Sequence, residues 1–246
     1  MSNKLSTAPL HNIGISDKGN YKSLNEDAFK ACPEMGLWVV ADGMGGHEGG
    51  EIASQLAVEQ ITRAVKGGIN LVNAIQQVHE DICQFAMTGN GKIGMATTVV
   101  AVQVIANEFE VAWVGDSRAY LFSQQQLTQL SRDHSVVQEL IDKGEINERQ
   151  ARIHPQRHLV SQALGGHNAI RVDVASGLLN DSVLLLCSDG LSNELTDDKI
   201  TAVLTESSCL KSKAEKLVAS VLALEGVDNI TVLLIQKVRK NITIRE

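Results

Sequence analysis

Hydrophobic residues recur along the chain with two different periods, and the period changes from one block of sequence to the next. Short runs rich in Val, Leu and Ile predict buried strands at 28–29, 37–41, 97–104, 110–114, 119–122, 184–187 and 230–235. Apolar residues spaced by three and four positions predict helices at about 51–65, 71–85 and 213–224. Because strands and helices come in blocks rather than in strict alternation, the pattern favours an α+β layered domain over a doubly wound sheet.

The segment 132–167 is the least regular and most polar part of the chain. One short amphipathic helix is predicted there, with Val136, Val137, Leu140 and Ile141 on its apolar face. The segment also carries several positively charged residues in a net-acidic chain, among them Arg132, Arg149, Arg152 and Arg157. Loops of this length inside a compact domain are usually functional. We therefore expect a mobile functional segment that contributes little to the core.

Three acidic residues lie at the ends of predicted strands. Asp42 and Asp189 each end an apolar run and precede a glycine, and Asp228 opens the last strand. If the strand ends meet, the carboxylates repel one another and are costly to desolvate unless a cation lies among them. Hard divalent cations such as Mg²⁺ or Mn²⁺ prefer oxygen ligands of this kind. The pattern therefore predicts a divalent metal site.

Composition and charge exclude several classes of protein. The 246 residues fit one large domain or two small ones, and a 43% hydrophobic content is enough for a sizeable core. The net charge of −7 argues against nucleic acid as the main partner. No run approaches the roughly 18 apolar residues of a membrane span, and the N-terminus has no apolar core of a signal peptide. The four cysteines form no CxxC pair, so reduced thiols and a cytoplasmic location are expected.

A glycine cluster at 43–50 suggests a phosphate loop but does not fit one. No Lys-Ser/Thr pair follows at the Walker spacing, and Glu48 replaces the third glycine of GxGxxG. The glycines instead permit a tight backbone path on which a carbonyl such as that of Gly43 faces a metal. Upstream, Asn25-Glu26-Asp27 alone reads as a solvated turn. The three strand-end acids weaken that interpretation.

These segments together resemble the motifs of a known family. In chain order they are SDKGNYKSLNEDAF, VVADGMGGHEGGEIAS, GMATTVVAV, VAWVGDSRAYLF, LTQLSRDHSVVQELIDKGEI, LLLCSDGLSNELTD and DNITVLLI. The series resembles the metal-dependent PPM/PP2C-type serine/threonine protein phosphatases, and most of all their compact bacterial members. The resemblance runs from about residue 13 to 235, and the order of the motifs makes coincidence implausible.

The resemblance implies a fold, an activity and a set of site residues. The implied fold is α/β/β/α: a central antiparallel β-sandwich flanked by helix pairs, in one domain over 1–246 with its core at about 13–236. Segment 132–167 corresponds to the family's flap beside the active site. The implied activity is hydrolysis of phosphoserine and phosphothreonine on proteins by attack of a metal-bridging water. The resemblance implies two Mg²⁺ or Mn²⁺ ions and a third ion that is bound more loosely. The ligands implied for the first two are Asp42, which bridges them, and Asp189, Asp228, Glu26 and the Gly43 carbonyl. Asp116 is the ligand implied for the third ion.

Three positions depart from the family pattern. Lys22 stands where the family usually has an Arg that grips the substrate phosphate, so phosphate capture is expected to survive with a point charge in place of a bidentate fork. Met44 stands where many eukaryotic members carry a His proposed as general acid, which leaves His47 or a metal-bound water for that role. A structural or surface role is the favoured interpretation of His47. His158 occupies a flap position where some relatives have a small hydroxyl residue.

Two other functions compete with this interpretation. One is a non-catalytic PPM-like regulator that binds a phosphoprotein or a kinase, but the intact Asp42, Asp189 and Asp228 count against it. The other is a phosphatase dedicated to one small regulatory protein; such enzymes usually carry extra sensor domains, for which this chain has no room.

We expect a monomer whose partners are phosphorylated proteins, the substrates of a serine/threonine protein kinase.

Overall fold

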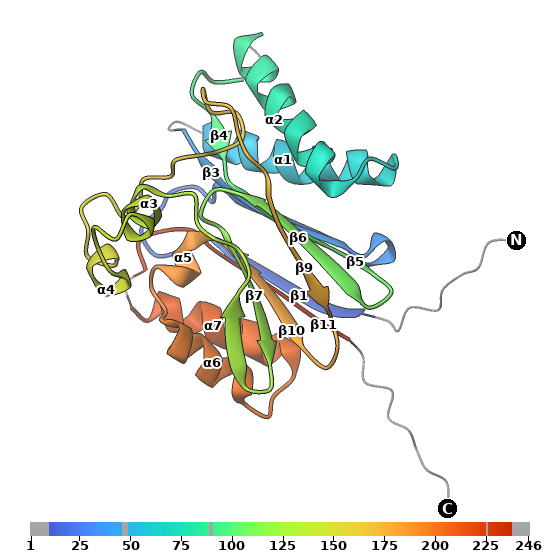
Figure 1. Ribbon diagram of the computed structural model, residues 1–246, viewed down its shortest axis with the longest axis vertical. Helices are drawn as coiled ribbons and strands as arrows, with labels where there is room; N and C mark the ends of the chain where they lie inside the picture. Colours follow the sequence, from blue (N-terminus) through green and yellow to red (C-terminus); the bar gives the residue numbers. More distant parts are fainter. Residues whose placement is uncertain (1–9, 46–48, 89–90, 225, 238–246) are drawn as a thin grey trace, which may run out of the picture.

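Two antiparallel sheets stacked face to face form the centre of the computed structural model, which describes residues 10–45, 49–88, 91–224 and 226–237 (Figure 1). The first sheet runs in the order β1 (Leu10–Asp17), β11 (Ile230–Lys237), β10 (Val183–Cys187), β7 (Arg118–Ser123) and β8 (Gln126–Gln129). The second runs β2 (Asp27–Cys32), β3 (Leu37–Met44), β5 (Val99–Ile105), β6 (Glu108–Val114) and β9 (Asp173–Leu178), and β4 (Ala96–Thr97) pairs with β3.

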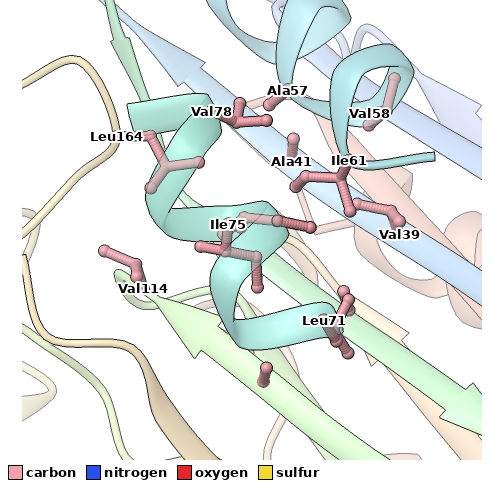
Figure 2. Close-up of a cluster of buried hydrophobic side chains, with 14 of the residues drawn as sticks. Val39, Ala41, Ala57, Val58, Ile61, Leu71, Ile75, Val78, Val114 and Leu164 are labelled. Carbon is pink, nitrogen blue, oxygen red and sulfur yellow. The ribbon is translucent and has the colours of Figure 1, made fainter. Parts of the chain in front are cut away.

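Helices cover the outer face of each sheet. The long helices α1 (Gly49–Lys66) and α2 (Leu71–Met87) pack on the second sheet through one apolar cluster (Figure 2). On the first sheet lie α5 (Asp189–Ser192), α6 (Asp197–Thr205) and α7 (Leu210–Leu222). The layers therefore run helix, sheet, sheet, helix, which confirms the predicted α/β/β/α sandwich.

Strand β3 shows why a continuous apolar run predicts a strand here. Leu37, Val39 and Ala41 point into the cluster beneath α1 and α2, whereas Trp38 and Val40 point into the core between the sheets. All five are fully buried, so neither face of the strand has room for a polar residue. Burial of each larger side chain contributes about 1.5–3 kcal/mol. This buried part of β3 is a rigid support for Asp42, which follows it on the same strand.

Several elements are absent from the sequence prediction. Strands β1 and β9 are only half-buried, so polar residues interrupt their apolar pattern. Within 132–167 the structure has not only the expected helix, α3 (Val136–Asp142), but also α4 (Glu148–Ala151), whose first turn is closed by a capping box. The 3₁₀ turn η1 (Pro33–Met35) connects β2 to β3. No helix in the described ranges is both long and apolar enough to cross a bilayer.

Candidate active site

The three strand-end aspartates come together at one end of the sandwich. Asp42 lies on β3 of the second sheet, Asp189 opens α5 directly after β10, and Asp228 precedes β11 in the first sheet. The charges of Asp189 and Asp228 both raise the pKa of Asp42, after burial, and the charge of Asp228 also raises that of Asp189. The three residues therefore approach one another from both sheets.

Crowding and burial perturb these carboxyl groups strongly. Burial raises the pKa of Asp42 well above its usual range, and the charges of Asp27, Asp189, Asp116 and Asp228 raise it further. The pKa of Asp189 is raised by burial and then by Asp228. Burial and the charge of Asp189 likewise raise the pKa of Asp116 well above its usual range. Such a set of acids stores repulsion that a bound cation would relieve.

The donor set fits a hard divalent ion. Each of the clustered groups offers carboxylate oxygens, which Mg²⁺ and Mn²⁺ prefer to nitrogen or sulfur. Within the described residues, no three His, Cys, Asp or Glu side chains already enclose a single point. In proteins Mg²⁺ commonly keeps several waters and takes only one or two carboxylates. The residues therefore fit hydrated ions held at the rim of the sandwich.

Asp27, which sequence reasoning passed over in favour of Glu26, joins the two sheets beneath the site. Its Oδ2 atom accepts hydrogen bonds of 2.7 Å from the hydroxyls of Ser188 and Thr231, which belong to the opposite sheet. Burial raises the pKa of Asp27 to about 7. Its Oδ1 atom has no hydrogen-bond partner among the described residues. The only sequence signal was its place opposite Asp42, in register on β2.

Asn229 holds the loop that carries Glu26 and Lys22. Its Oδ1 atom accepts the Glu26 N–H at 2.7 Å, and its amide donates to the carbonyls of Lys18 and Leu24 at 2.9 and 3.0 Å. The ammonium of Lys22 lies 2.6 Å from Oδ1 of Asp228. The predicted phosphate-binding lysine thus stands beside a predicted metal ligand. Sequence reasoning missed the role of Asn229, for which the only signal was its place beside Asp228.

Two glycines of the 43–50 cluster are needed because the backbone passes so close. A Cβ on Gly43 would lie 2.1 Å from the Gly50 carbonyl oxygen and 2.6 Å from that of Glu26. A Cβ on Gly50 would lie 2.4 Å from Oε1 of Glu26. This tight path brings Gly43 and Glu26 together at the start of α1, as the sequence predicts. His47 lies outside the described residues, so the prediction about it stays a prediction.

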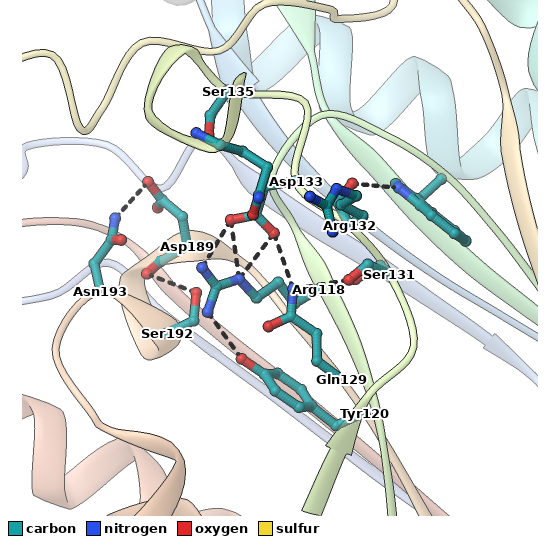
Figure 3. Close-up of polar contacts among 12 residues, drawn as sticks. Arg118, Tyr120, Gln129, Ser131, Arg132, Asp133, Ser135, Asp189, Ser192 and Asn193 are labelled. Carbon is teal, nitrogen blue, oxygen red and sulfur yellow. Dashed lines mark hydrogen bonds and ion pairs between the residues drawn. The ribbon is translucent and has the colours of Figure 1, made fainter. Parts of the chain in front are cut away.

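A pocket of about 170 Å³ separates the carboxylates from the flap, residues 132–167. Asp116 and Asp189 line one side of it, and Arg152 and Arg157 of the flap line the other. Figure 3 shows two polar contacts at its floor, which are the two-pronged pairing of Arg118 with Asp133 and the 2.9 Å hydrogen bond from Asn193 to Asp189.

Two basic groups act on Asp189 from opposite sides of the site. The charges of His158 on the flap and of Lys22 both lower the pKa of Asp189, against burial and the charge of Asp228, which raise it. The side chain of His158 is itself exposed. A basic group of the flap therefore reaches the carboxylate cluster electrostatically, although the sequence left the role of His158 undefined.

Comparison with known proteins agrees with this geometry. The sequence profile of the family Protein phosphatase 2C matches residues 20–223. The serine/threonine phosphatase stp of Listeria monocytogenes is 35% identical over 242 residues, which is 93% of this chain and 96% of that protein. Protein phosphatase PhpP of Streptococcus pneumoniae is 34% identical over 235 residues, covering 90% and 95%.

Solved structures show the same arrangement. The serine/threonine phosphatase PstP/Ppp of Mycobacterium tuberculosis superposes with a TM-score of 0.85 at 32% identity, covering 94% of this chain and 99% of that one. A PstP catalytic domain in complex with two manganese ions gives a TM-score of 0.83 at 31% identity, covering 94% and 99%. Together with these matches, the fold and its carboxylate cluster identify a phosphoprotein phosphatase of a metal-dependent family. The chain belongs to the protein phosphatase 2C family.

Proposed function

We propose that this phosphoprotein phosphatase hydrolyses phosphoserine and phosphothreonine at a centre of divalent ions held by Asp42, Asp189 and Asp228, with Glu26 and the Gly43 carbonyl. The observation that carries the proposal is the convergence, from two sheets, of half-buried carboxyl groups, of which those of Asp42 and Asp189 have pKa values raised by desolvation and by neighbouring acids. The ions are Mg²⁺ or Mn²⁺, and Asp116 at the edge of the pocket serves a third, looser ion. When bound, such ions lower the pKa of a water and neutralise phosphate oxygens.

The other residues of the site bind and orient the substrate. Lys22 supplies a positive charge for the phosphate from the loop that Asn229 holds. Arg152 and Arg157 face the same pocket from the flap and attract a phosphorylated segment towards a net-acidic protein. Asp27 fixes the two sheets, and hence the ligands they carry, relative to each other.

The partners are phosphorylated proteins, and we propose that they are substrates of a serine/threonine protein kinase. We also propose that the enzyme acts as a monomer in the cytoplasm. In support, four cysteines are free thiols, which is the state that a reducing compartment maintains: Cys32, Cys83, Cys187 and Cys209. A single-domain organisation over 1–246 is part of the same proposal, and both sheets contribute to one site in support of it.

A phosphopeptide panel assayed with Mn²⁺, Mg²⁺ and EDTA tests the proposal. We expect release of phosphate from phosphoserine and phosphothreonine peptides with either metal and none with EDTA. Asp42→Asn should abolish turnover, whereas Asp81→Asn, the same change at an exposed position of α2, should leave it intact. Binding of the peptides without phosphate release would identify a non-catalytic regulator. Turnover that persists in EDTA would contradict the metal centre.

A further inference from the structure

Both ends of the flap are fastened by a histidine that accepts a backbone hydrogen bond. At the N-terminal end, Nδ1 of His134 accepts the Gly115 N–H at 3.2 Å. At the C-terminal end, Nδ1 of His79 accepts the Gly165 N–H, also at 3.2 Å. His134 belongs to the flap itself, whereas His79 lies on α2, outside it. The contact of His79 therefore ties the flap to a helix of the scaffold.

The surroundings of His79 define its tautomer. A nitrogen that accepts an N–H carries no proton, so the ring is neutral with its proton on Nε2. Nε2 lies 3.9 Å from Sγ of Cys83, and that thiol lies 3.7 Å from the Gly166 carbonyl oxygen. Helix α2 thus contacts two consecutive residues at the flap's end through two side chains one turn apart.

Gly165 packs closely against α2 and leaves no space for a side chain. Its φ of +80° is left-handed, and a Cβ there would lie 2.4 Å from Cγ2 of Ile82 and 2.8 Å from the Met95 carbonyl oxygen. The position therefore accepts only glycine, pressed directly onto α2.

A short run of backbone hydrogen bonds leads from Gly165 to the proposed metal centre. The preceding residue, Leu164, exchanges two hydrogen bonds with Thr97, of 3.0 and 2.8 Å. The Thr97 hydroxyl donates to the Asp42 carbonyl at 2.9 Å, and the Thr98 N–H donates to the same oxygen at 2.8 Å. The peptide unit that follows Asp42 is thus held by β4 and the residue after it, and β4 also pairs with Leu164 at the end of the flap.

We propose that His79 is a positioning residue of the active site, which holds the flap's C-terminal end on α2 through Nδ1 and, through Leu164 and Thr97, steadies the backbone at Asp42. The catalytic part of the proposal rests on the proposed function of Asp42, whereas the tether rests on geometry alone. His79 does not line the pocket, so its effect on the site passes through the end of the flap at Gly165 and Gly166.

Protonation of His79 should release the tether. Burial lowers the pKa of His79, and the charge of Glu80 on the same helix opposes that shift. Segment 164–166 brings only apolar side chains and backbone to the ring, and the thiol of Cys83 is the other titratable neighbour. Because the folded state disfavours the imidazolium, the contact is complete above the ordinary pKa and is lost as the pH falls through the lowered pKa.

Two substitutions separate the role of Nδ1 from the mere presence of a polar side chain. In His79→Asn, Oδ1 takes the place of Nδ1 and can accept the Gly165 N–H. In His79→Gln, the longer side chain places its oxygen near the position of Nε2 instead. Hydrogen exchange of the Gly165 amide should be about five-fold faster in His79→Gln and close to wild type in His79→Asn. His11→Gln, on the exposed part of β1, is the matched control and should change nothing.

Steady-state kinetics with p-nitrophenyl phosphate and a phosphothreonine peptide complete the test. We expect His79→Gln to lower kcat/KM for the peptide about five-fold, with His79→Asn restoring it. The ratio of wild-type to His79→Asn activity should fall as the pH drops below 6.5, since titrations shared by both proteins cancel. Equal exchange or equal activity of the Asn and Gln variants would overturn the proposal. An inactive wild type with the expected exchange pattern would contradict the proposed function and leave the tether standing.

Discussion

Asp42 and Asp116 belong to the same carboxylate cluster, but we expect them to differ in how strongly catalysis depends on them. Asp42 lies between both sheets' acids, whereas Asp116 lines the pocket on the flap side. Asp42→Asn and Asp189→Asn should therefore lose essentially all turnover of p-nitrophenyl phosphate in Mn²⁺ while keeping the fold. Asp116→Ala should impair turnover but leave two tightly bound ions in a calorimetric titration. Near wild-type turnover by Asp42→Asn would exclude its bridging role.

Lys22 is expected to act on substrate capture. Burial lowers its pKa, but the hydrogen bond and charge of Asp228 outweigh burial and raise it, so the side chain is a cation at any working pH. Lys22→Ala should mainly raise KM for a phosphopeptide with metal affinity little changed, and Lys22→Arg should be tolerated or improve KM. Lys30→Ala, an exposed lysine of β2, is the control. An unchanged KM in Lys22→Ala would show that the phosphate binds elsewhere.

Asp27 is expected to matter for stability as well as for activity. Asp27→Ala leaves the buried hydroxyls of Ser188 and Thr231 without their acceptor, and an unsatisfied buried group costs about 1–3 kcal/mol. Urea unfolding in EDTA, which removes any contribution of bound metal, measures the change in the free energy of unfolding. Ser188→Ala removes one of these two hydrogen bonds and also the acceptor of the Thr231 N–H, at 2.9 Å, so it should destabilise the fold as well. Equal stability of Asp27→Ala and wild type would show that the sheets are held together elsewhere.

At the scale of elements, the flap should read the protein substrate. Arg152→Ala with Arg157→Ala should lower kcat/KM for a phosphoprotein far more than for p-nitrophenyl phosphate, which is too small to reach both arginines. The melting temperature should change little, because exposed substitutions usually cost under about 0.5 kcal/mol. Arg149→Ala, on the same flap but outside the pocket lining, serves as the control. Equal losses on both substrates would place the two arginines in the catalytic scaffold.

Elements that bury a whole face could be predicted from sequence, and those that do not could not. Strand β3 and helix α2 have uninterrupted apolar patterns, because every inward position meets a packed neighbour. Strand β1 alternates weakly, and its place in the sheet comes from full pairing with β11, some 200 residues away. Such long-range pairing leaves no mark in a local window of sequence.

The same division applies to the site. The acids at strand ends could be predicted because a charge beside a buried run is conspicuous. Asp27, Asn229 and His79 could not, since each acts through a hydrogen bond to a residue distant in the chain. In sequence they look like an ordinary turn acid, an amide and a helix-surface histidine.

At the scale of the whole molecule, metal binding should govern stability. The clustered acids have raised pKa values, so the folded metal-free protein binds more protons than the unfolded chain, and its stability falls as the pH rises from about 4 through 7. Mn²⁺ should remove this loss, so the increase in melting temperature on adding Mn²⁺ should be larger at pH 8 than at pH 6. A thermal-shift series in EDTA and Mn²⁺ measures it. An increase that does not depend on pH would contradict the assignment of the cluster as the metal site.

The pairing of β1 with β11 bears on how the protein is synthesised. Strand β11 lies between β1 and β10, and Asp228 directly precedes it. A growing polypeptide on the ribosome therefore carries Asp42 and Asp189 long before it has the strand that closes the first sheet. At a synthesis rate of about 5–20 residues per second, β11 is made roughly 10–40 seconds after β1. During that time the edge of β1 is unpaired and accessible to chaperones. Translation must therefore pass Lys237 before the enzyme can act on any phosphoprotein.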